Sequence, residues 1–154
     1  MIKINVILNN ISWTKYLKNP CNFIDKKIDL LNKKNKLHKK VNLICTLLLS
    51  GSKEIKKLNK KFRNKNKITD VLSFPFYEKK ILSRKILNEK EIYLGDIIIN
   101  ISKIKDKKNK IKFKNNFNKL WVHGLVHLFG HKHKKDKDFH IMNRLEKKYL
   151  EYLD

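Results

Sequence analysis

Four of the six histidines in this chain lie within eleven residues, in the segment WVHGLVHLFGHKH at positions 121–133. His123 and His127 are four residues apart, so on a helix their rings would share one face, about 6 Å apart along the axis. Two imidazoles placed in this way can bind one metal ion at about 2.0–2.1 Å each. Such a pair occurs by chance on many helices, so a third ligand decides whether this is a metal site.

The third ligand is expected after Gly130, which is a natural end for a helix. On a continuing helix His131 would lie about 12 Å from His123, too far to share its metal, so we expect His131 to be a pocket group. A chain that turns at Gly130 can bring His133 back instead. The frame HxxxHxxGxxH is the three-histidine spacing of metzincin metalloproteases, and three ligands leave a fourth position for water. The alternative is a set of structural or solvent-facing histidines.

Gly124 stands where a zinc protease has the glutamate that takes a proton from metal-bound water. Glycine cannot act as that base, so peptide hydrolysis is disfavoured. A phosphodiester needs the base less, because it has its own acidic oxygens. A metal ion can polarise a phosphoryl oxygen, or lower the pKa of a water ligand towards about 7.

The elements that must position these residues alternate between strands and helices. Apolar, β-branched runs predict strands at 2–8, 41–50, 69–76 and 93–101. Helical spacing predicts helices at 20–34, 53–63 with Ser52 as the cap, 103–114, 115–130 and 138–153. Residues 78–91 are expected to form a loop. We expect one α/β (α+β) domain over 1–154, with a small mixed sheet of about four strands and about five helices; the pattern does not give the strand order.

Composition narrows the class of protein. The length of 154 residues suits one domain. Cys21 and Cys45 form no CxxC pair, so we interpret them as reduced core thiols. The first twenty residues lack the features of a secretory signal, and no segment approaches the about 18 apolar residues of a membrane span. We therefore expect a cytoplasmic protein that does not contact membranes.

The formal net charge of +24 favours polyanionic partners, of which nucleic acid is the usual one. Only three of the 38 basic residues are arginine, and the chain has neither alanine nor glutamine. Such a composition is typical of AT-rich codons, so mutational drift is an alternative source of most of the lysines. The charge alone therefore supports nucleic-acid binding only weakly.

Three ordered blocks of the sequence resemble the YbeY-type rRNA maturation endoribonucleases. The segment HGLVHLFGHKH is similar to the hallmark HGxLHLxGYDH of that family, in which glycine follows the first histidine. The segments LNKKFRNKNKITDVLSFPF and YLGDIIIN resemble its second and third blocks. Met142 falls where the family usually has a methionine in the last helix, and the resemblance extends from about Leu58 to Leu150.

The resemblance implies one zinc ion bound by His123, His127 and His133, and it places the arginine of the second block at Arg63. It further implies single-strand-specific RNA cleavage, in maturation of the 3′ end of small-subunit (16S) rRNA and in ribosome quality control. The implied partners are ribosomal RNA, the small ribosomal subunit and ribosome-associated proteins. Lys132 replaces the family's usual aspartate, and its cation disfavours metal binding unless the side chain points to solvent.

Arg63 is the candidate for a phosphate contact, because a guanidinium can hold a phosphate through two parallel hydrogen bonds and lysine cannot. The alternative is a surface arginine that closes a helix. Asp70 and Asp96 could orient a ligand histidine, although capping and turn formation are commoner roles. Phe74 and Phe76 could stack on bases, with core packing as the alternative for at least one of them.

Taken together, the residues and the resemblance predict a zinc-dependent endoribonuclease that acts on ribosomal RNA. Two alternatives remain. One is a zinc hydrolase of peptide or small-molecule substrates, which Gly124 disfavours. The other is a non-catalytic ribosome-assembly factor with a structural zinc. Because all three would hold the metal, zinc content alone cannot separate them, whereas incubation with single-stranded RNA can.

Overall fold

The computed structural model describes residues 1–35, 40–132 and 136–154. In chain order, the strands and helices are β1 (Ile2–Leu8), η1 (Ile11–Lys15), α1 (Pro20–Lys34), β2 (Asn42–Ser50), α2 (Ser52–Arg63), β3 (Val71–Pro75), α3 (Lys79–Asn88), β4 (Glu91–Asn100), η2 (Ile101–Lys103), α4 (Lys110–Leu128) and α5 (Asp136–Tyr152). The expectation of a mixed sheet of four strands with five α-helices is confirmed within these residues.

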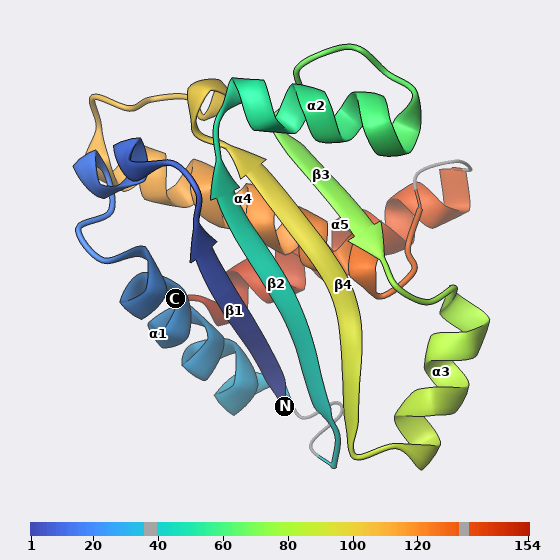
Figure 1. Ribbon diagram of the computed structural model, residues 1–154. Helices are drawn as coiled ribbons and strands as arrows, with labels where there is room; N and C mark the ends of the chain where they lie inside the picture. Colours follow the sequence, from blue (N-terminus) through green and yellow to red (C-terminus); the bar gives the residue numbers. More distant parts are fainter. Residues whose placement is uncertain (36–39, 133–135) are drawn as a thin grey trace.

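The sheet has the strand order β1-β2-β4-β3. Strands β1, β2 and β4 are parallel, and β3 pairs antiparallel with β4 at the edge. Helices α1, α4 and α5 cover one face of the sheet, whereas α2 crosses the opposite face (Figure 1). Strand β3 lies at the edge of the sheet and leads into α3. The C-terminal part of α4 packs on β3, and Gly130 lies against Lys79 at the start of α3.

The main core lies between the sheet and the three helices of the covered face. Strand β2 alternates buried and half-buried residues, so that one set of its side chains, Leu43, Cys45, Leu47 and Leu49, is fully buried against α1, α4 and α5. Trp13, Phe117 and Trp121 are also fully buried in this cluster. A smaller cluster around Ile55 fixes α2 on the opposite face. Both helix layers are therefore anchored by apolar side chains.

Three predictions about the elements are wrong. The separate helices expected at 103–114 and 115–130 are one helix, α4, which begins only at Lys110. Residues 78–91, expected to form a loop, contain α3, because Leu82 is buried and Ile86 packs on the core one helical turn later. The charged residues between them concealed that spacing. Ser52 is the first residue of α2 and not its cap: Gly51 holds the cap position, and the Ser52 hydroxyl bonds to Asn100 instead.

The cysteine interpretation is right for one residue only. Cys45 is fully buried, and burial raises the pKa of its thiol to about 12, so it is inert at neutral pH. Cys21 is exposed on α1 and does not belong to the core. Of the helices that the structure describes, none is both long and apolar enough to cross a membrane.

Candidate metal centre

Helix α4 positions the two central histidines. Asn109 caps its first turn, accepting hydrogen bonds from the backbone N–H groups of Ile111 and Lys112. Fully buried side chains then fix the rotation of the helix against the sheet: Phe117, Trp121, Val122, Leu125 and Leu128. His123 and His127 stand on the remaining, half-buried side of the last two turns. The predicted placement of this pair on one helix face is therefore confirmed.

The two rings converge on a common point. The Nε2 atoms of His123 and His127 are 3.2 Å apart, and the ring planes are inclined by 85°. On the other side of each ring, Nδ1 of His123 lies 2.8 Å from Glu146 Oε1, and Nδ1 of His127 lies 2.7 Å from the carbonyl oxygen of His131. Both oxygens are acceptors, so Nδ1 of each ring donates to an oxygen and the two Nε2 atoms face each other.

This geometry fits a cation between the rings. Two ring nitrogens at 3.2 Å are held together either by a shared proton, in an N–H···N hydrogen bond, or by a metal ion between them. In a tetrahedral zinc site with bonds of 2.0–2.1 Å, two ligand nitrogens are about 3.3 Å apart, close to the distance observed here. The third expected ligand, His133, lies outside the described residues, and no group of three or more potential ligands occurs among the residues the structure does describe.

Glu146 is a site residue that the sequence analysis missed. It lies on α5 and, like His123, is largely buried, with 24% of its side chain exposed. A carboxylate on Nδ1 fixes the orientation of a ligand ring and increases its basicity. One signal was available: Glu146 follows the buried Met142 by four residues, so it lies on the side of α5 that faces α4.

The two carboxylates that were considered for this role have structural roles instead. Asp70 Oδ1 accepts hydrogen bonds from the Val71 backbone and from Thr69 at the start of β3. Asp96 Oδ1 accepts a hydrogen bond from the Tyr93 hydroxyl at 2.5 Å. Neither of these contacts involves a histidine, so the capping and structural alternative holds for both residues.

His131 contributes to the site through its backbone. Its carbonyl oxygen accepts the hydrogen bond from His127, because the chain turns at Gly130, whose φ is +83°. Its imidazole is half-buried, and burial together with the neighbouring Lys79 lowers its pKa, opposed in part by Asp138. The expectation that His131 is a pocket group agrees with this position.

A surface hollow of about 690 Å³ lies beside His127 at the end of α4, and we call it the histidine hollow. Its lining residues are Arg63, Lys65, Ser73, Pro75, Phe76, Tyr77, Glu78, Lys79, His127, Gly130, His131 and Lys132. Four of these side chains are cationic and one is acidic, so the hollow attracts anions. Lys132 is exposed, so solvent screens its charge.

Arg63 is held at the wall of the histidine hollow. Its Nη2 donates a hydrogen bond to the Ser73 carbonyl at 3.0 Å, and its guanidinium carbon lies 5.7 Å from the centre of the Phe74 ring. The hydrogen bond crosses to β3, and does not go to a carbonyl at the end of α2. Arg63 is an exposed residue, and it lines the same hollow as His127.

The two phenylalanines of β3 and its exit differ in environment. Phe74 is half-buried, packs on the smaller cluster and contacts the Phe62 ring. Phe76 is 64% exposed and lines the histidine hollow. Core packing therefore accounts for Phe74, whereas Phe76 presents an exposed ring on which a base can stack.

Gly124 not only lacks the side chain of a general base but also allows α4 to pack closely on the sheet. A Cβ at this position would lie 2.6 Å from Ile97 Cγ2 and 3.1 Å from Ser73 Oγ. Real Cβ atoms do not approach this closely, so glycine is required for α4 to pack directly on β4 and β3. Sequence reasoning saw which chemistry glycine excludes, but not this close approach.

These features define a class of α/β proteins in which a long helix, packed on a mixed sheet, carries a convergent histidine pair beside a basic hollow. A family model described as Endoribonuclease YbeY matches residues 8–154. The chain therefore belongs to the YbeY family.

Individual relatives agree with this assignment. An "Endoribonuclease YbeY" from Pelagibacter ubique is 45% identical over 149 residues, covering 95% of this chain and 92% of the relative. Another, from Thermodesulfovibrio yellowstonii, is 33% identical and covers 84% of this chain and 76% of the relative. A solution structure of a Thermotoga maritima protein, 26% identical, superposes with a TM-score of 0.58 over 98% of this chain and 89% of its own.

Proposed function

We propose that this protein is a zinc-dependent endoribonuclease that cleaves single-stranded RNA, in maturation of the 3′ end of small-subunit rRNA and in ribosome quality control. The relatives named endoribonuclease support the reaction class. The observation that carries the proposal is the Nε2 pair at 3.2 Å, with each ring held from behind by an oxygen. The partners we propose are ribosomal RNA, the small subunit and its associated proteins, in the cytoplasm.

The zinc ligands would be His123, His127 and His133. Imidazole nitrogen is a preferred ligand of Zn²⁺, and Glu146 and the His131 carbonyl support the two described rings through Nδ1. When bound, zinc supplies a Lewis acid for the phosphoryl group and lowers the pKa of a water ligand.

The chain's own residues hold the substrate. The guanidinium group of Arg63 binds the phosphate, and Lys65 and Lys79 add positive charge to the same hollow. The exposed ring of Phe76 stacks on a base. The bases of a duplex are already paired and stacked on each other, so this contact favours single-stranded RNA. Gly124 provides no general base, so proton transfer falls to groups outside that position.

The deciding experiment incubates the zinc-loaded protein with single-stranded RNA and with a duplex of the same sequence, each with and without a chelator. We expect cleavage of the single strand only, and its loss with the chelator. The variant His127→Ala should be inactive, whereas His140→Ala, which removes an exposed histidine of α5, should retain activity. Absence of cleavage by the zinc-loaded protein would contradict the proposal and favour an assembly factor with a structural metal.

A further inference from the structure

A second basic depression lies at the other end of α4, where the helix faces η1 and α1. Three adjoining cavities of about 540, 220 and 380 Å³ share lining residues and form one continuous groove. We call it the α1/α4 groove, and its central section is lined by Tyr16, Lys18, Phe23, Lys26, Lys110 and Lys114. The groove joins two segments of the chain that are more than seventy residues apart in the sequence.

The α1/α4 groove is a surface separate from the histidine hollow. Lys114 precedes His123 by nine residues, which is two and a half helical turns, so the two side chains leave α4 on opposite sides. They are also about 14 Å apart along the axis. A ligand in the groove therefore does not occupy the histidine hollow.

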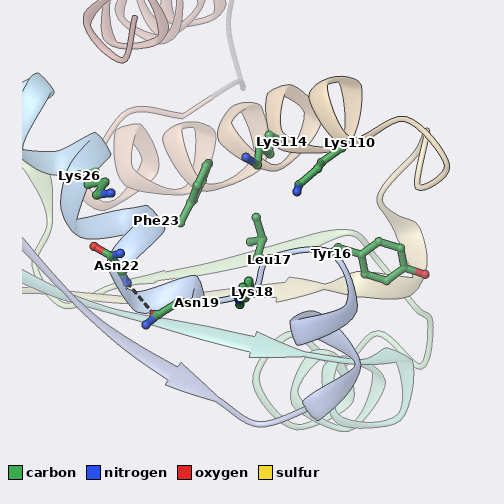
Figure 2. Close-up of a pocket in the computed structure, with 9 residues that line it drawn as sticks. All are labelled: Tyr16, Leu17, Lys18, Asn19, Asn22, Phe23, Lys26, Lys110 and Lys114. Atoms are coloured by element: carbon green, nitrogen blue, oxygen red, sulfur yellow. Dashed lines mark hydrogen bonds between the residues drawn. The ribbon is translucent and has the colours of Figure 1, made fainter.

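The charge of the groove has one sign. Eight lysines line its three sections, and none of the described lining residues is aspartate or glutamate. Figure 2 shows Lys110 and Lys114 descending from α4 towards the Leu17–Lys18 segment, so that cations from two elements face the same space. A concave surface focuses such a potential more strongly than a flat one, and it attracts a polyanion.

Aromatic rings interrupt the lysines. The half-buried ring of Phe23 stands between α1 and α4, with Lys114 Nζ at 5.7 Å from its centre (Figure 2). Tyr16 stacks on Phe113 at 4.9 Å, which gives the groove a rigid second ring. Cations that follow a phosphate backbone, alternating with rings on which bases stack, are the surface that binds single-stranded nucleic acid.

We propose that the α1/α4 groove binds single-stranded RNA outside the segment held in the histidine hollow. The lysines contact successive phosphates, and Phe23 contacts a base. The inference rests on the proposed function only in naming RNA as the polymer. A flanking strand anchored here would hold the substrate while its cleaved segment lies at the opposite end of α4.

The test measures the affinity of zinc-loaded full-length protein for a 20-nucleotide 2′-O-methyl oligouridylate over a range of salt concentrations. The variant Lys18→Gln/Lys26→Gln/Lys110→Gln removes three exposed groove lysines. We expect at least about tenfold weaker binding. The slope of the logarithm of the binding constant against the logarithm of the salt concentration should become shallower by about two, because each lost phosphate contact removes about 0.7 from that slope. The control Lys3→Gln/Lys33→Gln/Lys147→Gln removes the same charge from exposed sites elsewhere and should change neither quantity substantially.

A second variant separates stacking from charge. Phe23→Leu retains an apolar side chain and all lysines, so we expect about tenfold weaker binding at an unchanged salt dependence. Equal losses in the groove and control triple variants would overturn the proposal, since the lysines would then act as diffuse charge. Displacement of the oligonucleotide by polyglutamate as effective as by unlabelled RNA would also overturn it, in favour of an acidic protein partner. Binding is read without cleavage, so an inactive enzyme would refute the proposed function and leave this test intact.

Discussion

The two ends of α4 use the same helix for different kinds of recognition. At the C-terminal end, three contacts of 2.7–3.2 Å hold the ring nitrogens of His123 and His127 in one arrangement. At the N-terminal end, Lys110 is exposed, and Lys114 has a cation–π contact at 5.7 Å that permits considerable movement. The first end depends on the position of single atoms, whereas the second depends on the number of charges. Removal of a single histidine should therefore matter greatly at the C-terminal end, whereas removal of a single lysine should matter little at the N-terminal end.

The largest effect is expected at the histidine pair. His123→Ala and His127→Ala should each weaken zinc binding by more than about a hundredfold, because each removes a ligand nitrogen. His131→Ala should retain zinc, because this residue contributes a backbone carbonyl that alanine also has. Zinc content of the purified variants, determined by elemental analysis, measures the difference. Loss of zinc from His131→Ala as complete as from His127→Ala would show that its ring is a ligand.

A smaller effect is expected one contact further from the metal. Glu146→Gln retains an oxygen that can accept the hydrogen bond of His123 Nδ1, but it loses the negative charge. We expect zinc affinity to fall by about tenfold, within the range for such supporting residues. Glu151→Gln removes an exposed carboxylate of the same helix and serves as the matched control. Competition against a chelator measures both, and equal affinities of the two variants would remove Glu146 from the site.

Arg63 tests whether geometry also matters in the histidine hollow. Arg63→Lys retains the charge but loses the planar fork, so we expect RNA cleavage to fall about tenfold while zinc content and melting temperature are unchanged. The matched control is Arg84→Lys on α3, which makes the same exchange of arginine for lysine outside the histidine hollow and should leave RNA cleavage unchanged. Cleavage close to that of the unaltered protein would mean that only charge is needed, as at the other end of α4. A marked decrease in melting temperature would instead indicate that the bond to Ser73 is structural.

The smallest effect is expected at Lys132. Because its side chain is exposed, solvent screens its charge from the metal, and Lys132→Asp should tighten zinc binding by only about two- to fivefold. Chelator competition at low and high salt measures the change, which should diminish as salt increases. Weaker binding in this variant would show that the charge of Lys132 does not oppose the metal.

The sequence predicts the parts of this molecule whose spacing is local. The two histidines of α4, the four strands and the helix stop at Gly130 all follow from periodicity within one segment. Contacts between distant segments could not be obtained in this way. Glu146 reaches His123 only through the packing of α5 on α4, and the α1/α4 groove exists only because η1 and α1 lie beside α4. Helix α3 was missed because one buried and one half-buried position, Leu82 and Ile86, leave a weak pattern among basic residues.

The close approach at Gly124 also limits what this scaffold can become. Many zinc proteases share the histidine spacing found here, but at the position after the first histidine they have glutamate where this chain has glycine. A side chain at position 124 would collide with Ile97 Cγ2 at 2.6 Å, so exchange of this one residue would push α4 away from the sheet before any base could act. A smaller residue at position 97 would relieve this contact, but by itself it would leave a cavity under the candidate metal centre. A glutamate base at position 124 would therefore need a rearrangement around Ile97 as well as the exchange of the glycine itself.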